Sequence, residues 1–84
     1  PRISFFHGIS IFMFYGDHPP AHFHAAYGDY RARVGLGGEV LAGMLPTRAA
    51  GLVKAWALLH RVDLMQYWDR VTRMEPPGTI APLP

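Results

Sequence analysis

The side chains best suited to chemistry are concentrated in one short segment, Asp17-His18-Pro19-Pro20-Ala21-His22-Phe23-His24. His22 and His24 are two residues apart, so on a β-strand both imidazoles would project from the same face. His18 precedes them across two prolines, which stiffen the chain. Three convergent histidines can hold a zinc or iron ion with an open coordination position. One hypothesis therefore takes His18, His22 and His24 as metal ligands. The nearby carboxylates are Asp17, Asp29 and Glu39.

Gly28 and Asp29 lie between two runs of strand-forming residues, 21–27 and 30–36. A glycine in the first position of a two-residue loop is typical of a type II′ hairpin turn. That turn places Tyr27 opposite Tyr30 and, further along, His24 opposite Arg33. The polar face of the hairpin then carries His22, His24, Arg31 and Arg33. The opposite face, expected to join the core, carries Phe23, Ala25, Tyr27, Tyr30, Ala32 and Val34. A slip of one residue would bury the arginines, so this register is strongly specified.

An arginine beside a histidine favours an anion over a metal ion. The cationic Arg33 would repel a divalent ion, whereas arginines bind phosphate through paired donors and a neutral histidine can act as a general base. This second hypothesis assigns catalysis to His18, His22 and His24, and substrate binding to Arg31 and Arg33. A third interpretation is a solvated sheet face on which these residues have no function.

Length and composition limit the kind of site that the protein can have. The chain has 84 residues, which is one domain, and a chain of this size buries too little surface to enclose a cofactor. An active site should therefore be a surface groove. Cysteine is absent, which excludes disulfides, zinc–thiolate sites and thiol nucleophiles, and which suits the reducing cytoplasm. No long basic run accompanies the net charge of +2, and no apolar stretch has the length of a membrane span.

The elements that would position these residues form an α+β domain over residues 1–74, followed by a proline-rich tail over 75–84. Strand-forming residues predict a small antiparallel sheet of about five strands, at 3–7, 9–15, 21–27, 30–36 and 39–45. A two-residue turn at Gly37-Gly38 would pair Val34 with Leu41 and Arg33 with Ala42. Thr47 could cap a helix, and the apolar spacing after it fits either one long helix or two with a break near residues 60–63.

Most of the chain resembles a bacterial family known only as domain of unknown function 4160. The resemblance rests on a His-Pro-Pro-x-His-Phe-His motif at residues 18–24 and on the flanking stretches. These are Pro1-Arg2-Ile3-Ser4, Phe14-Tyr15-Gly16-Asp17, Tyr27-Gly28-Asp29-Tyr30, the run from Gly38 to Pro46, Leu52-Val53, Trp56, Leu59-His60-Arg61 and Trp68. The family motif falls on His18, Pro19, Pro20, His22 and His24, with Asp29, Glu39 and Trp68 as secondary matches.

The resemblance implies two consecutive helices and a cytoplasmic protein of a two-gene, toxin–antitoxin-like module. Its partner would be a small protein encoded alongside, of the domain of unknown function 2442 family. We therefore expect a His/Arg sheet face that binds or cleaves a phosphate-bearing substrate such as RNA. The alternatives are a non-catalytic protein-binding or transcription-regulatory module, and the metal site with its divalent ion. DNA or a second copy of the chain are further partners that the sequence leaves open, and it does not decide whether the protein is an enzyme.

Overall fold

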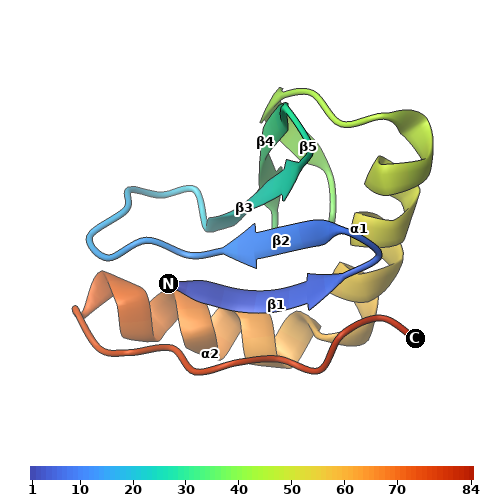
Figure 1. Ribbon diagram of the computed structural model, residues 1–84. Helices are drawn as coiled ribbons and strands as arrows, with labels where there is room; N and C mark the ends of the chain where they lie inside the picture. The colour runs from blue at the N-terminus through green and yellow to red at the C-terminus, as the bar shows by residue number, and fades with distance from the viewer.

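The computed structural model describes all residues from 1 to 84 and contains one antiparallel sheet and two helices. The α+β fold expected from the sequence is confirmed. The strands are β1 (Arg2–Phe6), β2 (Ile9–Phe12), β3 (His22–Tyr27), β4 (Tyr30–Gly35) and β5 (Val40–Gly43). The helices are α1 (Thr47–Leu59) and α2 (Arg61–Thr72). The strand order follows the chain, so each strand pairs with the next one (Figure 1).

The core lies between one face of the sheet and the two helices. Alternate residues of the strands, among them Ile11 and Phe23, pack there against Trp56 of α1 and Leu64 of α2, all fully buried. The rings of Phe23 and Trp56 meet edge to face with their centroids 5.6 Å apart. Because side chains alternate along a strand, the residues between these core positions must line the opposite face of the sheet.

The hairpin of β3 and β4 has the register that its turn predicts. Tyr27 faces Tyr30, and His24 faces Arg33. Gly28 has a positive φ of 55°, which glycine adopts without a steric penalty. One detail of the expected core face is wrong, because Tyr27 and Tyr30 are exposed at the hairpin tip, beyond the reach of the helices.

The second turn differs from the two-residue turn expected at Gly37-Gly38. The Gly38 N–H donates to the carbonyl of Gly35 at 2.8 Å, so the loop starts one residue earlier and Gly38 takes a positive φ of 90°. Val34 consequently pairs with Val40, and not with Leu41. An irregularity in β5 then returns Arg33 to its expected position opposite Ala42. The bulge thus restores the predicted arrangement around Arg33.

The structure resolves the helical region into two helices, as the family resemblance implied. The chain leaves the helical conformation at His60, with φ −123° and ψ 28°, and α2 begins at the next residue. Thr47 does not cap α1, since it is already the first helical residue and Pro46 occupies the cap position without a side-chain hydrogen bond. A proline is suited to this position because the φ of −56° found there is close to the value that its ring imposes.

The proline-rich tail contains no helix or strand, but it packs against the folded body. The Ile80 N–H donates to the carbonyl of Ile3 at 2.7 Å, and the Ser4 hydroxyl donates to the carbonyl of Ile80 at 3.0 Å. Further along, the Trp56 indole N–H donates to the carbonyl of Ala81 at 2.9 Å. The tail therefore runs beside β1 (Figure 1) and covers one edge of the sheet, leaving β5 as its uncovered edge.

We predict that Ile80→Ala destabilises the protein, because the side chain of Ile80 is buried against the core cluster. Removing a buried isoleucine side chain costs about 2–4 kcal/mol, to be measured by urea denaturation. Thr79→Ala, at an exposed neighbouring position, is the matched control and should change the free energy of unfolding by less than about 0.5 kcal/mol. Equal stability of Ile80→Ala and the unmodified protein would show that the tail does not contribute to the fold.

Candidate functional site

The sheet face opposite the helices is hollowed into an open groove of about 760 Å³. The groove crosses β2, β3, β4 and β5. Small residues form much of its lining, and these include Gly8, Ser10, Ala26, Gly28, Ala42 and Gly43. Because these small side chains barely project from the sheet, the longer aromatic, histidine and arginine side chains around them form the walls of the groove. The groove thus has room for a ligand, and aromatic side chains on the one hand and histidine and arginine side chains on the other border it.

Aromatic rings form one border of the groove. Phe12 and Phe14 lie nearly parallel, with ring centroids 5.9 Å apart and an angle of 9° between the planes. Phe14 also contacts His24, whose ring centroid is 4.7 Å away, and it remains 45% exposed. Both phenylalanines face the groove because Ile11 and Met13, which alternate with them, are buried in the core. Exposed flat rings of this kind can stack on other planar groups.

Two arginines from β4 border the groove beside this aromatic cluster. Arg33 lies directly opposite His24 and is exposed, and its guanidinium makes no hydrogen bond to the protein. Arg31 is also exposed, and its guanidinium donates to the carbonyls of Gly28 and Tyr30. Arg33 is therefore the arginine whose donors are all available to a ligand, whereas the hairpin tip holds the Arg31 side chain in place.

A third part of the site is a cluster of Asp17, His22 and His24 at the aromatic end of the groove. The Asp17 Oδ2 atom lies 2.9 Å from Nε2 of His22 and 3.0 Å from Nε2 of His24. Asp17 reaches the two rings from the loop after β2. The preceding Gly16 fixes that loop, with a positive φ of 70° and an N–H that donates to the carbonyl of Val71 in α2 at 3.2 Å.

His22 is buried, with only 3% of its surface exposed. Its Nδ1 atom lies 2.8 Å from the carbonyl oxygen of Pro20, and its ring packs against Trp68 of α2 at a centroid distance of 5.1 Å. The expectation of a solvated face shared by both histidines is therefore wrong for His22. The loop carrying Asp17 and Pro20 folds over it, and the end of α2 closes the other side.

The environment of Asp17 lowers the pKa of its carboxyl group. Partial burial alone would raise this pKa, but hydrogen bonds from His24 and His22 and the attraction of their rings together outweigh it. The carboxylate is consequently held in its charged form, as an acceptor shared by the two imidazoles.

The family model for the domain of unknown function 4160 (DUF4160) matches residues 8–69. The chain belongs to this family. No curated protein sequence and no solved structure matched the chain significantly. Neither helix of this DUF4160 domain has the length and apolar character needed to cross a membrane.

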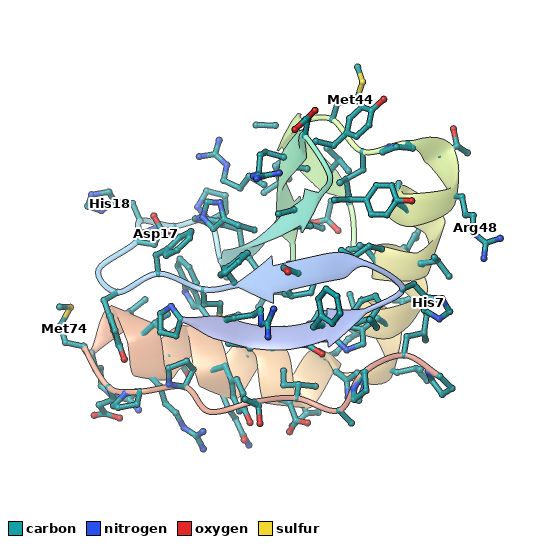
Figure 2. All side chains as sticks on the ribbon, viewed as in Figure 1. His7, Asp17, His18, Met44, Arg48 and Met74 are labelled. Atoms are coloured by element: carbon teal, nitrogen blue, oxygen red, sulfur yellow. The ribbon has the colours of Figure 1, made fainter.

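Within the DUF4160 motif, the structure brings together some of the predicted site residues and separates others. His24 and Arg33 meet at the groove, whereas His18 is exposed on the loop and points away from the sheet (Figure 2). Asp17, which the sequence indicated only as a nearby carboxylate, takes the place beside His22 and His24 that was expected for His18. The catalytic roles of the three histidines stay predictions.

The aromatic border of the groove was not among the predicted site residues of this DUF4160 domain. Its signal was present in the sequence, because residues 9–14 are apolar at every position but one. A run of this kind is typical of an interior strand, and β2 does pair on both sides. It did not show that one face of the strand would remain uncovered by helices.

We predict that Asp17→Asn lowers the stability of the DUF4160 domain near neutral pH and has less effect in acid. The folded state lowers the pKa of Asp17 below its ordinary value of 3.8, so its stabilising contribution is present above that value and is lost as the pH falls through the folded pKa. Weakening hydrogen bonds to a charged acceptor should cost about 1–3 kcal/mol at neutral pH. Urea denaturation with a chelator present, repeated near pH 3, measures the difference.

Asp29→Asn is the matched control, since Asp29 is exposed at the hairpin tip and forms no ion pair. It should leave stability unchanged at both pH values. An Asp17→Asn effect of the same size at both pH values would contradict the assigned role of the carboxylate charge.

Proposed function

We propose that this protein binds single-stranded RNA on the open face of its sheet. The observation that carries the proposal is the joint placement of a free guanidinium, Arg33, and two neighbouring aromatic rings, exposed Phe14 and half-buried Phe12, along one groove. Single strands offer alternating phosphates and planar bases, and proteins that bind them combine positive charge with aromatic stacking. A double helix hides its bases and would not use the rings.

The other features of the groove support the same ligand. Its lining of small residues leaves room for a backbone to approach the sheet closely, and the groove is open to solvent. Arg31, held at the hairpin tip, would extend the positive border toward the next phosphate. Because a phosphate accepts paired hydrogen bonds from a guanidinium, Arg33 would fix the position of the strand.

We further propose that this activity belongs to a two-gene, toxin–antitoxin-like module of the bacterial cytoplasm, which is what the family resemblance implies. In this proposal the RNA-binding chain is one component, and a small protein encoded alongside is its partner. An exposed apolar patch supports a protein–protein contact. It consists of Leu58, Leu59, Val62 and Met65, each more than half exposed, around the junction of α1 and α2. Contiguous exposed apolar side chains of this kind mark interaction surfaces.

The second candidate function is protein binding alone, and the apolar patch is the observation that favours it. In that case the helix junction would bind the partner protein while the groove has no ligand. The two functions use different surfaces, since the groove is lined by strands and the patch belongs to the helices. Variants of each surface can therefore separate them.

We predict that Arg33→Ala weakens binding of a short fluorescent oligouridylate, measured by anisotropy, and reduces the slope of log affinity against log salt by about one. Arg48→Ala is the matched control, because Arg48 is an exposed arginine on α1, distant from the groove (Figure 2). In the same assay Phe14→Leu should cost about 1–3 kcal/mol and Phe14→Tyr much less, since tyrosine keeps a stacking ring.

A failure of the unmodified protein to bind RNA would refute the proposal, as would an equal loss of affinity in Arg33→Ala and Arg48→Ala. An oligodeoxyuridylate of the same length tests the preference for RNA. Equal affinity for both oligonucleotides would mean that the groove binds single-stranded nucleic acid in general and does not prefer RNA.

We predict that Val62→Lys prevents copurification with the neighbouring gene product but leaves oligouridylate affinity unchanged. A lysine at the centre of the apolar patch would bury an unpaired charge in the contact. Arg33→Ala should show the reverse pattern and should also remove any growth arrest caused by expressing the chain alone. Copurification that survives Val62→Lys would exclude the helix junction as the partner surface.

A further inference from the structure

The geometry of the Asp17, His22 and His24 cluster fits a second kind of ligand, which is independent of RNA binding. One ligand atom from each residue, Asp17 Oδ2 and the two histidine Nε2 atoms, lies within 4.8 Å of the others. Two ligand atoms that are each about 2.1 Å from a metal ion lie about 3.4 Å apart at the tetrahedral angle that zinc prefers, and about 3 Å apart when the bonds are at right angles. The distances of 2.9 and 3.0 Å from Asp17 to the two imidazoles are within about half an ångström of both spacings, so small side-chain movements would admit an ion.

The two polar contacts of the His22 ring cannot both be hydrogen bonds when the ring is neutral. Its Nδ1 faces the Pro20 carbonyl and its Nε2 faces the Asp17 carboxylate, and both of these groups only accept hydrogen bonds. A neutral imidazole has a single N–H and can satisfy only one of them. A metal ion bound to Nε2 of His22 and to the Asp17 carboxylate would satisfy both atoms, while Nδ1–H donates to the Pro20 carbonyl.

The surroundings of His22 favour the metal. With Nδ1–H donating to the Pro20 carbonyl, the lone pair of Nε2 is directed at the cluster, which is the usual arrangement of a histidine that binds a metal. Burial and the contact with Trp68 fix the ring in this orientation. The ligand set is thus held in place before any ion arrives.

The negative charge of the cluster offsets the repulsion that Arg33 would exert on a divalent ion. A site of three neutral histidines would leave a divalent ion beside a guanidinium with nothing to offset the repulsion. Here the Asp17 carboxylate supplies one negative charge at the site itself, in contact with both rings. Asp17 and His24 are each about 30% exposed, so the side away from buried His22 is open to further ligands from water.

We propose that Asp17, His22 and His24 bind one divalent transition-metal ion of the zinc type, through Oδ2 and the two Nε2 atoms, with the remaining coordination positions open. Two imidazoles and a carboxylate are a ligand set that zinc and ferrous iron both use. His18 is not part of this site. Magnesium, which prefers oxygen ligands, should bind far more weakly.

The test uses the full chain without a histidine tag, stripped with a chelator and titrated calorimetrically with Zn²⁺, and with Co²⁺ followed by its visible absorption. We expect saturation at one equivalent and a rise in thermal stability on adding Zn²⁺. Asp17→Asn and His24→Gln should each lower Zn²⁺ affinity by more than about a hundredfold, since even residues behind the ligands matter by ten- to a hundredfold. Anaerobic titration with Fe²⁺ and competition against Zn²⁺ then identifies the preferred ion.

His18→Ala and His60→Ala are the matched controls and should retain the affinity of the unmodified protein. Circular dichroism of each variant without metal shows that it is folded. Absence of saturable Zn²⁺ binding in the unmodified protein would overturn the proposal. So would an affinity that is unchanged in folded Asp17→Asn, or one that His18→Ala lowers as much as Asp17→Asn does.

Discussion

The tight turn at Gly28 is the constraint on which the functional surface depends. A positive φ at this glycine closes the β3–β4 hairpin in a single register, and that register decides which side chains face the helices. Phe23 and Val34 then fill the core, while His24 and Arg33 stand together on the open face. A shift of one residue would set the core positions of one strand opposite the arginines of the other, and either Arg33 would enter the core or Phe23 would turn to the solvent, at a cost that a small domain could not sustain. The groove thus follows from the same turn as the core.

The second constraint is the shared carboxylate of Asp17. The loop between β2 and β3 has no regular structure, yet its aspartate is hydrogen-bonded to two imidazoles and its Gly16 to α2. These contacts join the sheet, the loop and a helix at the end of the groove where Phe14 packs on His24. The groove and the cluster are adjacent but differ in chemistry, since the first offers positive charge and stacking rings and the second offers a negative charge and two nitrogen ligands.

The sequence predicted what depends on local rules. Alternation and the Gly28 turn were enough for the hairpin register, and the helical spacing with the family resemblance was enough for two helices. Features that depend on contacts between distant segments of the chain could not be predicted from the sequence. The burial of His22 depends on the loop and on Trp68, 46 residues later (68 minus 22), and the packing of Ile80 on β1 joins opposite ends of the chain. The second turn was displaced by one residue because consecutive glycines allow several loop lengths, and only the bulge in β5 kept Arg33 in place.

The open sheet face is the surface expected to meet a ligand, and amide chemical-shift mapping by NMR tests this most directly. On titration with single-stranded oligouridylate, we expect the amide chemical shifts to change at groove positions on β2, β3 and β4, among them Phe12, His24 and Arg33. The amide chemical shifts of α1 and α2 should stay unchanged. Changes confined to the helix junction around Val62, or no saturable change anywhere, would contradict the account.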